Sequence, residues 1–526
     1  MELEAINWEQ DLPLDADEAY QSLVRSLRRT DGFALLFVRC SPVQGDQIID
    51  DVHADLPSKT IEVLELKESI DNLYDHVAAL SNRDQINVLF VRGIEYSIFA
   101  YEDREMHDIN LRSQSSGYGG TWQGIPRVLG HLNLSRERFR DNFKFCFIFL
   151  LPEFALRYFI RRAPDFFDWR SNIYEFPTDK EIVNQEAYRL AYLDGDYDEY
   201  CEQTHSQRIA KLSSILSYLD ENPDPENEAA LWLTKGLIHR AGKEYEEALI
   251  SLDKSLQIKT DDCKAWNNKG IVLKNLARLE EAIICYEKAL EISPDYHQAW
   301  GNLGNVFRDL SRHEEAIASY DKSLAIKPDY QTVWNNRGVT LRKLGRHEEA
   351  ITSFDRTLEI KPDNYQAWGN RGYSLKDLGK LEEAIMSFDK VLEIKPESYQ
   401  SWGYRGSALS NLGRHEEAIA SYDMVLTINP DDQAAWKLRG NSLKNICRYE
   451  EAIASYDKAL QFKSDDYQVW NNRGSSLKNL GRHEEAIASY DKVLKIKRDY
   501  FLAWHNRGNS LRNLGRHEEA IYFDRK

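Results

Sequence analysis

The 526-residue sequence has few residues that could carry covalent or metal chemistry. Its six cysteines form neither a CxxC pair nor a metal-ligand spacing, which excludes a disulfide framework and predicts a reducing compartment. The most apolar run, Phe145 to Leu151, is too short to span a bilayer, so no membrane partner is expected. Because the first residues are acidic and lack an apolar core, no signal peptide is expected, and the sequence predicts a cytoplasmic location.

Positive charge is scarce in the first part of the chain. Residues 1–228 hold 42 acidic and 23 basic side chains, whereas residues 229–526 hold 44 acidic and 45 basic ones. The net charge of −18 therefore belongs to the first part. Because nucleic acid is bound mainly through basic side chains, nucleic acid is not expected as a partner of this acidic part.

Residues 1–178 alternate short apolar runs with helical patterns, which predicts one α/β domain with a mostly parallel sheet. Strands are expected at residues 33–39, 60–66, 87–92 and 145–151, with a last short one near Tyr174. This domain lacks the phosphate-binding motif GxxxxGK[ST]. Without the Lys that reaches the terminal phosphates and the Ser or Thr that holds magnesium, nucleotide hydrolysis is disfavoured, and no cofactor is expected.

Two segments of this domain carry weaker nucleotide-site signals. Glu95 follows an apolar strand where a metal-side acid could stand, and its alternative interpretation is an ordinary loop charge. The loop Ser116 to Gly124 is rich in glycine, but it has no Lys and does not join a strand directly to a helix, which favours a mobile loop over a phosphate cradle.

The second half of the chain is organised by one unit that occurs nine times. Its tryptophans are 34 residues apart, a Gly follows four residues after each, and an Ala sixteen residues after each; the tryptophans are Trp232, Trp266, Trp300, Trp334, Trp368, Trp402, Trp436, Trp470 and Trp504. Apolar residues at helical spacing, a Gly between two such patterns and a following Lys-Pro-Asp predict two antiparallel helices in each unit. The small Gly and Ala would let these helices approach closely.

This pattern resembles the tetratricopeptide repeat (TPR) family. The resemblance covers residues 229–526 and implies an all-α superhelical solenoid of nine repeats, preceded by a helical connector or cap at residues 179–228. The sequence departs from the family pattern at the residue before the Gly, where eight repeats carry Arg or Lys and Leu303 is the exception. This departure adds a row of charge.

The resemblance also implies that the first helix of each repeat lines a concave groove. The ligand-facing positions of the family include +2, +8 and +9, counted from the Trp of each repeat. The candidate groove residues are Lys274, Asn302, Arg308, Asn336, Arg342, Asn370, Lys376, Lys444, Asn472, Lys478, Asn506 and Arg512. The alternative is a solvated polar face that duplication of a single unit has left behind.

Five histidines, His313, His347, His415, His483 and His517, recur at one position of the turn between the two helices. They stand one per repeat, so no metal site is expected. The last repeat stops at Lys526 without a further helix to cover it, which predicts homo-oligomers through that end.

The later part of the first domain resembles the degenerate ATPase-like modules that precede TPR arrays in some bacterial proteins of the signal-transducing (STAND) class. This resemblance implies that Asn133 and Arg136 lie near the edge of a nucleotide site; surface charges on a solvated helix are the alternative.

Two hypotheses of function follow. The first is an interaction scaffold or sensor whose groove binds an acidic protein segment, which could be its own acidic head, with the head as docking or regulatory module. The alternative is a STAND-like nucleotide switch with the array as its sensor. Because the phosphate-clamping residues are absent, the first hypothesis is favoured, and the protein is not expected to be an NTPase.

Overall fold

The computed structural model describes residues 15–67, 69–98, 126–176 and 180–524. The chain forms two compact units, residues 1–294 and 295–526, which are taken separately below. The glycine-rich segment at residues 116–124 lies outside the described residues. No helix among the described residues is both long and apolar enough to cross a membrane.

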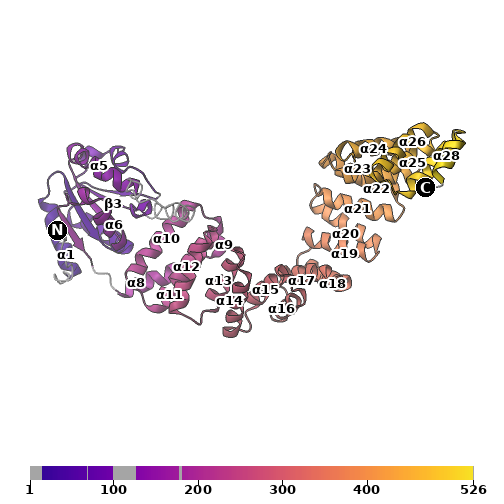
Figure 1. Cartoon of the computed structure of the whole chain (residues 1–526). Helices are drawn as coiled ribbons and strands as arrows, with labels where there is room; N and C mark the ends of the chain where they lie inside the picture. The colour runs from indigo at the N-terminus through magenta and orange to yellow at the C-terminus, as the bar shows by residue number, and fades with distance from the viewer. Residues whose placement is uncertain (1–14, 68, 99–125, 177–179, 525–526) are drawn as a thin grey trace, which may run out of the picture. The chain divides into compact units, whose positions relative to one another are not determined.

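A five-stranded parallel sheet forms the centre of the N-terminal head (Figure 1). Its order is β2-β3-β4-β1-β5. The strands are β1 (Ala34–Arg39), β2 (Ile61–Glu65), β3 (Val88–Arg92), β4 (Cys146–Leu151) and β5 (Asn172–Glu175). β1 and β4 are in register from Ala34 opposite Cys146 to Arg39 opposite Leu151. The predicted parallel α/β fold of the head is confirmed.

Helices cover both faces of this sheet, because alternate residues of the central strands are apolar on both sides. The covering helices are α1 (Ala16–Arg29) and α2 (Pro42–Asp55) on one face, and α3 (Leu73–Ala78), α5 (Arg127–Asn142), α6 (Glu153–Arg162) and α7 (Pro164–Phe167) on the other. Leu36 and Val38 pack with α1 and α2. Phe37 packs on the opposite side, against Phe149, Phe159 and Phe167.

A helical connector follows the head and shares its core with the first repeat. It consists of α8 (Lys180–Tyr188), a π-helical turn (Arg189–Leu193), α9 (Tyr197–Glu202) and α10 (His205–Asp220). Leu190, Leu212 and Ile215 pack with Leu231 and Ile238 of α11 (Pro225–Ala241). The connector therefore covers the apolar face that an isolated first repeat would expose. Residues 177–179 lie outside the described part, and the domain boundaries at residues 178 and 228 stay predictions.

Nine helix pairs make up the array within residues 225–524. The first helices after α11 are α13 (Cys263–Asn275), α15 (His297–Asp309), α17 (Gln331–Lys343), α19 (Tyr365–Asp377), α21 (Tyr399–Asn411), α23 (Gln433–Asn445), α25 (Tyr467–Asn479) and α27 (Phe501–Asn513). The second helices are α12 (Tyr245–Ile258), α14 (Leu279–Ile292), α16 (His313–Ile326), α18 (His347–Ile360), α20 (Leu381–Ile394), α22 (His415–Ile428), α24 (Tyr449–Phe462), α26 (His483–Ile496) and α28 (His517–Asp524). The predicted solenoid of paired helices is confirmed.

The Gly of each repeat is the point where the two helices of a pair touch. A Cβ built on Gly338 would lie 2.6 Å from Cε1 of Phe354, and one on Gly372 would lie 2.8 Å from Cε1 of Phe388. A fully buried Tyr or Phe, twenty residues after the Trp, fills the space beside the Gly in most repeats. The close approach predicted from the sequence is confirmed, but the ring beside the Gly is this Phe or Tyr.

The repeat Trp is only partly buried. Trp368 is half-exposed, and its Nε1 donates to the carbonyl oxygen of Pro362 at 2.8 Å, which ties the first helix to the preceding turn. The guanidinium of Arg371 lies 5.8 Å from the centre of its ring. The interpretation of Trp334 and Trp368 as rings that fill the inter-helix core was therefore wrong.

The corner between the two helices of each repeat uses a left-handed residue. Five repeats place Gly there, as at Gly345 with φ of +75°. The other four place Lys243, Ala277, Ser311 and Cys447 in the same conformation, with φ between +58° and +65°. For a residue with a side chain this conformation costs on the order of 1–2 kcal/mol, so these four corners hold the backbone against its local preference.

The basic residue before each Gly forms a clamp between repeats. Arg405 on α21 donates from Nε to Asp389 of the preceding repeat at 2.6 Å, and from Nη1 to the buried Ser421 of its own repeat at 2.8 Å. Arg337, Arg371, Arg439 and Arg473 repeat both contacts. The extra row of charge is thus neutralised inside the array and couples neighbouring repeats.

Loss of one clamp should be measurable as a loss of stability. We expect Arg405→Met to lower the free energy of unfolding by about 1–2 kcal/mol, because hydrogen bonds to charged groups that are mostly buried are lost. A double-mutant cycle with Asp389→Asn in urea unfolding measures the pair directly. Arg356→Met is the matched control, since Arg356 forms an exposed pair with Glu359 at 2.7 Å and should change stability by less than about 0.5 kcal/mol. Equal effects of the two arginine substitutions would contradict the clamp.

Candidate functional site

The first helices of successive repeats form a continuous inner face. In residues 295–526, α15, α17, α19, α21, α23, α25 and α27 each contact the next first helix directly. The candidate groove residues lie along them: Lys274 on α13, Asn302 and Arg308 on α15, Asn336 and Arg342 on α17, Asn370 and Lys376 on α19, Lys444 on α23, Asn472 and Lys478 on α25, and Asn506 and Arg512 on α27.

Several of these residues pair with each other across repeats. Lys444 Nζ lies 3.5 Å from Oδ1 of Asn472, and Lys478 Nζ donates to Oδ1 of Asn506 at 3.1 Å. Burial lowers the pKa of Lys444 below its usual value. In these repeats the basic residue at +8 and the Asn at +2 therefore form a polar ladder, so the row is not a set of free charges.

A second kind of pairing extends the ladder. Asn336 donates from Nδ2 to Oδ1 of Asn305 at 2.9 Å, and Oδ1 of Asn305 also accepts from the Tyr320 hydroxyl at 2.9 Å. Asn472 makes the same contact with Asn441, at the same distance. Arg308 pairs with the neighbouring Asp309 at 3.1 Å. Amide and cationic groups are thus held in fixed positions along the inner face.

The ladder changes character in the fifth to seventh repeats, where the sequence pattern gave no warning. Tyr404 and Leu438 occupy the +2 position that is Asn in six repeats, and they are 40% and 37% exposed. Tyr404 packs edge-on against Tyr373 with ring centres 4.5 Å apart. Arg342 lies over Tyr373 at 5.6 Å and Lys376 over Tyr404 at 5.8 Å. We call these five residues the aromatic stretch.

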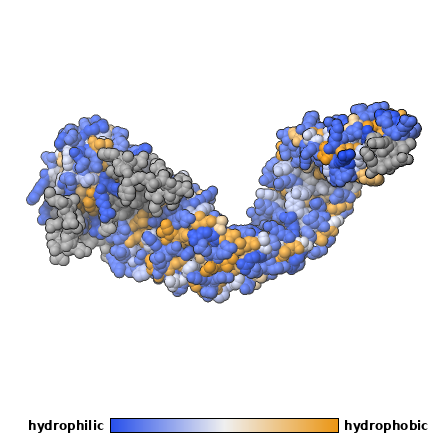
Figure 2. Space-filling view, in the orientation of Figure 1, coloured by the Kyte–Doolittle hydropathy of each residue, from blue (hydrophilic) through white to orange (hydrophobic). Residues whose placement is uncertain are grey.

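Hydrophilic residues cover most of the visible surface of the C-terminal unit, with separate hydrophobic areas between them (Figure 2). A scattered pattern of this kind is normal for an exposed surface. An exposed tyrosine and leucine at neighbouring inner-face positions, beside two cations, are therefore informative.

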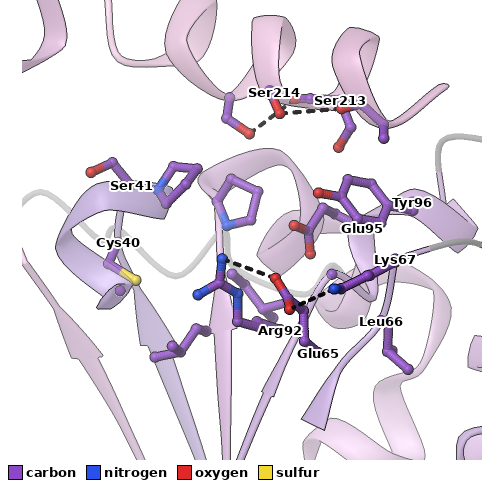
Figure 3. Close-up of a pocket in the computed structure, with 18 residues that line it drawn as sticks. Cys40, Ser41, Glu65, Leu66, Lys67, Arg92, Glu95, Tyr96, Ser213 and Ser214 are labelled. Atoms are coloured by element: carbon purple, nitrogen blue, oxygen red, sulfur yellow. Dashed lines mark hydrogen bonds and ion pairs between the residues drawn. The ribbon is translucent and has the colours of Figure 1, made fainter. Parts of the chain in front are cut away.

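The head holds a separate pocket at the carboxyl ends of its strands (Figure 3). Its volume is about 300 Å³. After β1 the chain enters α2 on one face of the sheet, and after the adjacent β4 it enters α6 on the other face. Ligands of open parallel sheets bind at such a reversal point. Serines of the connector helix α10, Ser213, Ser214 and Ser217, close the pocket, and sequence analysis did not anticipate them.

Glu95 is the one candidate cofactor residue that lines this pocket. It follows Gly93, whose φ of +86° and contact with the Leu66 carbonyl allow no side chain. The residue is partly exposed, but its Oε2 is closed off from solvent and has no hydrogen-bond partner among the described residues. Burial raises the pKa of Glu95 to about 7, and nearby backbone hydrogen bonds and Arg92 offset part of the increase.

The other two candidates lie elsewhere. Asn133 accepts a hydrogen bond from the backbone N–H of Phe166 at 2.9 Å, and Arg136 pairs with Asp165 at 3.1 Å. Both residues therefore hold α7 against α5, and neither lines the pocket. Their prediction as nucleotide-edge residues was wrong, because the packing of α7 on α5 could not be derived from the sequence.

The pocket residues do not fit a nucleotide triphosphate. Only Cys40 and Ser41 separate β1 from α2, Ser41 bonds Gln44 in a capping box, and Pro42 contributes no N–H. The cations beside the pocket are already paired: Arg92 with Asp46 and Glu65, and Lys67 with Glu65 at 3.6 Å (Figure 3). A triphosphate would instead face the carboxylates of Glu65 and Glu95.

Comparison with known proteins agrees with the geometry of the array. Models of the tetratricopeptide repeat match residues 229–262, 261–329, 332–364, 365–398, 399–432, 467–500 and 502–522. A model of the protein prenyltransferase alpha subunit repeat matches residues 449–480, inside the same array. The chain is therefore a tetratricopeptide-repeat protein. No curated protein sequence matches it.

Solved structures similar to the chain are also repeat proteins of this kind. YrrB, described as a TPR protein with an unusual peptide-binding site, is 25% identical, with 35% of this chain and 95% of YrrB covered and a TM-score of 0.33. PilF of Pseudomonas aeruginosa is 21% identical, with 38% and 92% covered and a TM-score of 0.33. A tetratricopeptide repeat protein of Parabacteroides merdae is 19% identical, with 47% and 98% covered and a TM-score of 0.35.

Proposed function

We propose that this protein is a protein-interaction scaffold whose inner face binds an extended, acidic protein segment. The observation that carries the proposal is the arrangement of basic +8 residues and +2 asparagines along successive first helices. Asn side chains can both donate to and accept from a ligand backbone, which gives affinity without a strict sequence requirement. Arg342 and Lys376 face aromatic rings and add positive charge.

The distribution of charge supports an acidic ligand. The Glu-Glu pairs begin the second helices, where Arg346, Arg414, Arg448 and Arg482 bind them. The acidic groups of the array are thus engaged on its second helices. An intramolecular occupant is also available in this proposal, since residues 1–228 carry the excess negative charge of the chain and could compete with a partner as docking or regulatory module.

The alternative, a nucleotide switch, is supported only by the pocket and Glu95. The paired cations and the two carboxylates described above disfavour phosphate there, so we propose a head without NTPase activity.

Charge reversal on the inner face tests the scaffold proposal. We expect replacement of Arg308, Arg342 and Lys376 by Glu to weaken binding of a labelled glutamate heptapeptide by about ten-fold or more at low salt. Exposed pairs contribute only ~0–1 kcal/mol each, so three must change together and added salt should reduce the difference. Fluorescence anisotropy measures both.

The control makes the same charge change on the second helices, at the exposed residues Arg356, Lys390 and Lys458. Binding should then stay within about two-fold of the unmodified chain. An equal loss in both triple variants would show a general charge effect, and unchanged affinity in the inner-face variant would refute the proposal.

A further inference from the structure

The connector places an aromatic residue on the inner face of the first repeat. Tyr197 of α9 stacks on Arg240, the +8 residue of that repeat, with the guanidinium carbon 3.5 Å from the ring centre. Arg240 is only 8% exposed and also bonds Asn268, the +2 residue of the next repeat. A segment from outside the repeats thus occupies one position of the ladder inside the chain itself.

The segment that does so is acidic and aromatic. It reads Asp194-Gly-Asp-Tyr-Asp-Glu-Tyr-Cys-Glu202, with five carboxylates and with tyrosines at positions 197 and 200. A guanidinium over an aromatic face is attracted by the ring's negative charge, most strongly when both are withdrawn from water. The first repeat therefore shows which chemistry the +8 cations accept: an aromatic side chain within an acidic segment.

The aromatic stretch presents the same chemistry without such a cover. Arg342 and Lys376 lie over Tyr373 and Tyr404, and the Nε of Arg342 is buried without a hydrogen-bond partner among the described residues. Phe388 supports Tyr404 from below, with parallel rings 6.0 Å apart. The rings are thus fixed in place before any ligand arrives, which reduces the entropy lost on binding.

We propose that the aromatic stretch is the specificity site of the scaffold, and that it binds an acidic segment with two aromatic or large apolar side chains three residues apart. The proposal rests on the proposed function. Packed helices lie about 8–10 Å apart, and three residues of extended chain span about 10 Å. One side chain therefore seats beside Tyr404 and the next beside Leu438, while the carboxylates meet Arg342 and Lys376.

A labelled peptide of residues 194–202, with serine in place of Cys201, is the probe. We expect it to bind the full chain about five- to ten-fold more tightly than the same peptide with both tyrosines replaced by alanine, because stacking and cation–π contacts are lost. The double variant Tyr404→Asn/Leu438→Asn installs the residue that six repeats carry at this position, so it should fold normally, as an unchanged urea midpoint would show. It should bind both peptides equally.

The glutamate heptapeptide separates this proposal from the scaffold proposal. If it binds normally but the tyrosines make no difference, the specificity site is refuted and the scaffold stands. If the preference for tyrosine persists in the double variant, the aromatic stretch is likewise refuted as its source. If neither peptide binds the unmodified chain, both proposals fail.

Discussion

Replacing Phe388 by alanine should lower the free energy of unfolding by about 3–5 kcal/mol, the range for deleting a large buried aromatic side chain. Phe388 is fully buried on α20, touches the position where Gly372 has no side chain, and lies against Tyr373 and Tyr404. Because contacts in a solenoid run between neighbours, the loss of amide protection should be concentrated in the adjacent repeats. Urea unfolding and hydrogen exchange measure the two effects.

The chain supplies matched controls for this substitution. Tyr422, Tyr456 and Tyr490 occupy the same position in other repeats, so Phe388→Tyr should change stability by less than about 1 kcal/mol. Trp368→Ala should cost less than Phe388→Ala, because Trp368 is half-exposed. If Trp368→Ala costs more, the conserved period of the tryptophans marks the core after all.

The head should lose stability as the pH rises from about 4.5 to about 7, and Glu95→Gln should remove most of that loss. In the folded chain burial raises the pKa of Glu95 from 4.5 to about 7. The folded state therefore holds a proton on Glu95 that the unfolded state has released over this interval, and each unit of pH weakens folding. The substitution should stabilise the head at pH 8, relative to its effect at pH 4, by up to about 3 kcal/mol.

Urea unfolding of both proteins at the two pH values, followed by a signal from the head, tests this expectation. Glu137→Gln, at an exposed position of α5, is the control and should show no such dependence on pH. A Glu95→Gln effect that is the same at pH 4 and pH 8 would mean that the carboxyl is ionised in the folded chain.

The period of the repeat could be predicted in detail from the sequence, while the role of its most visible residue could not. A Trp every 34 residues suggests a core residue, yet burial depends on which ring the Gly admits, and the small Gly faces Phe388 or its equivalents. The Arg before the Gly is similar: its partners Asp389 and Ser421 lie 16 residues away on either side, a relation that only the stacking of pairs reveals.

The head shows the same limit. Apolar runs located all five strands to within about two residues, because buried parallel strands are almost continuously apolar. Glu95 was placed correctly at the end of a strand, but Ser213 and Ser214 come from a helix more than a hundred residues later, and their approach depends on tertiary packing. Asn133 and Arg136 failed for that reason as well.

The left-handed corners separate two properties that mutations often change together. Lys243, Ala277, Ser311 and Cys447 each hold a conformation that glycine adopts freely at the same position of the other repeats. These corners lie outside the first-helix positions that form the inner face. The lineage of this protein can therefore gain stability at the corners and spend it on new side chains at positions +2 and +8, so that its binding specificity can evolve without loss of the fold.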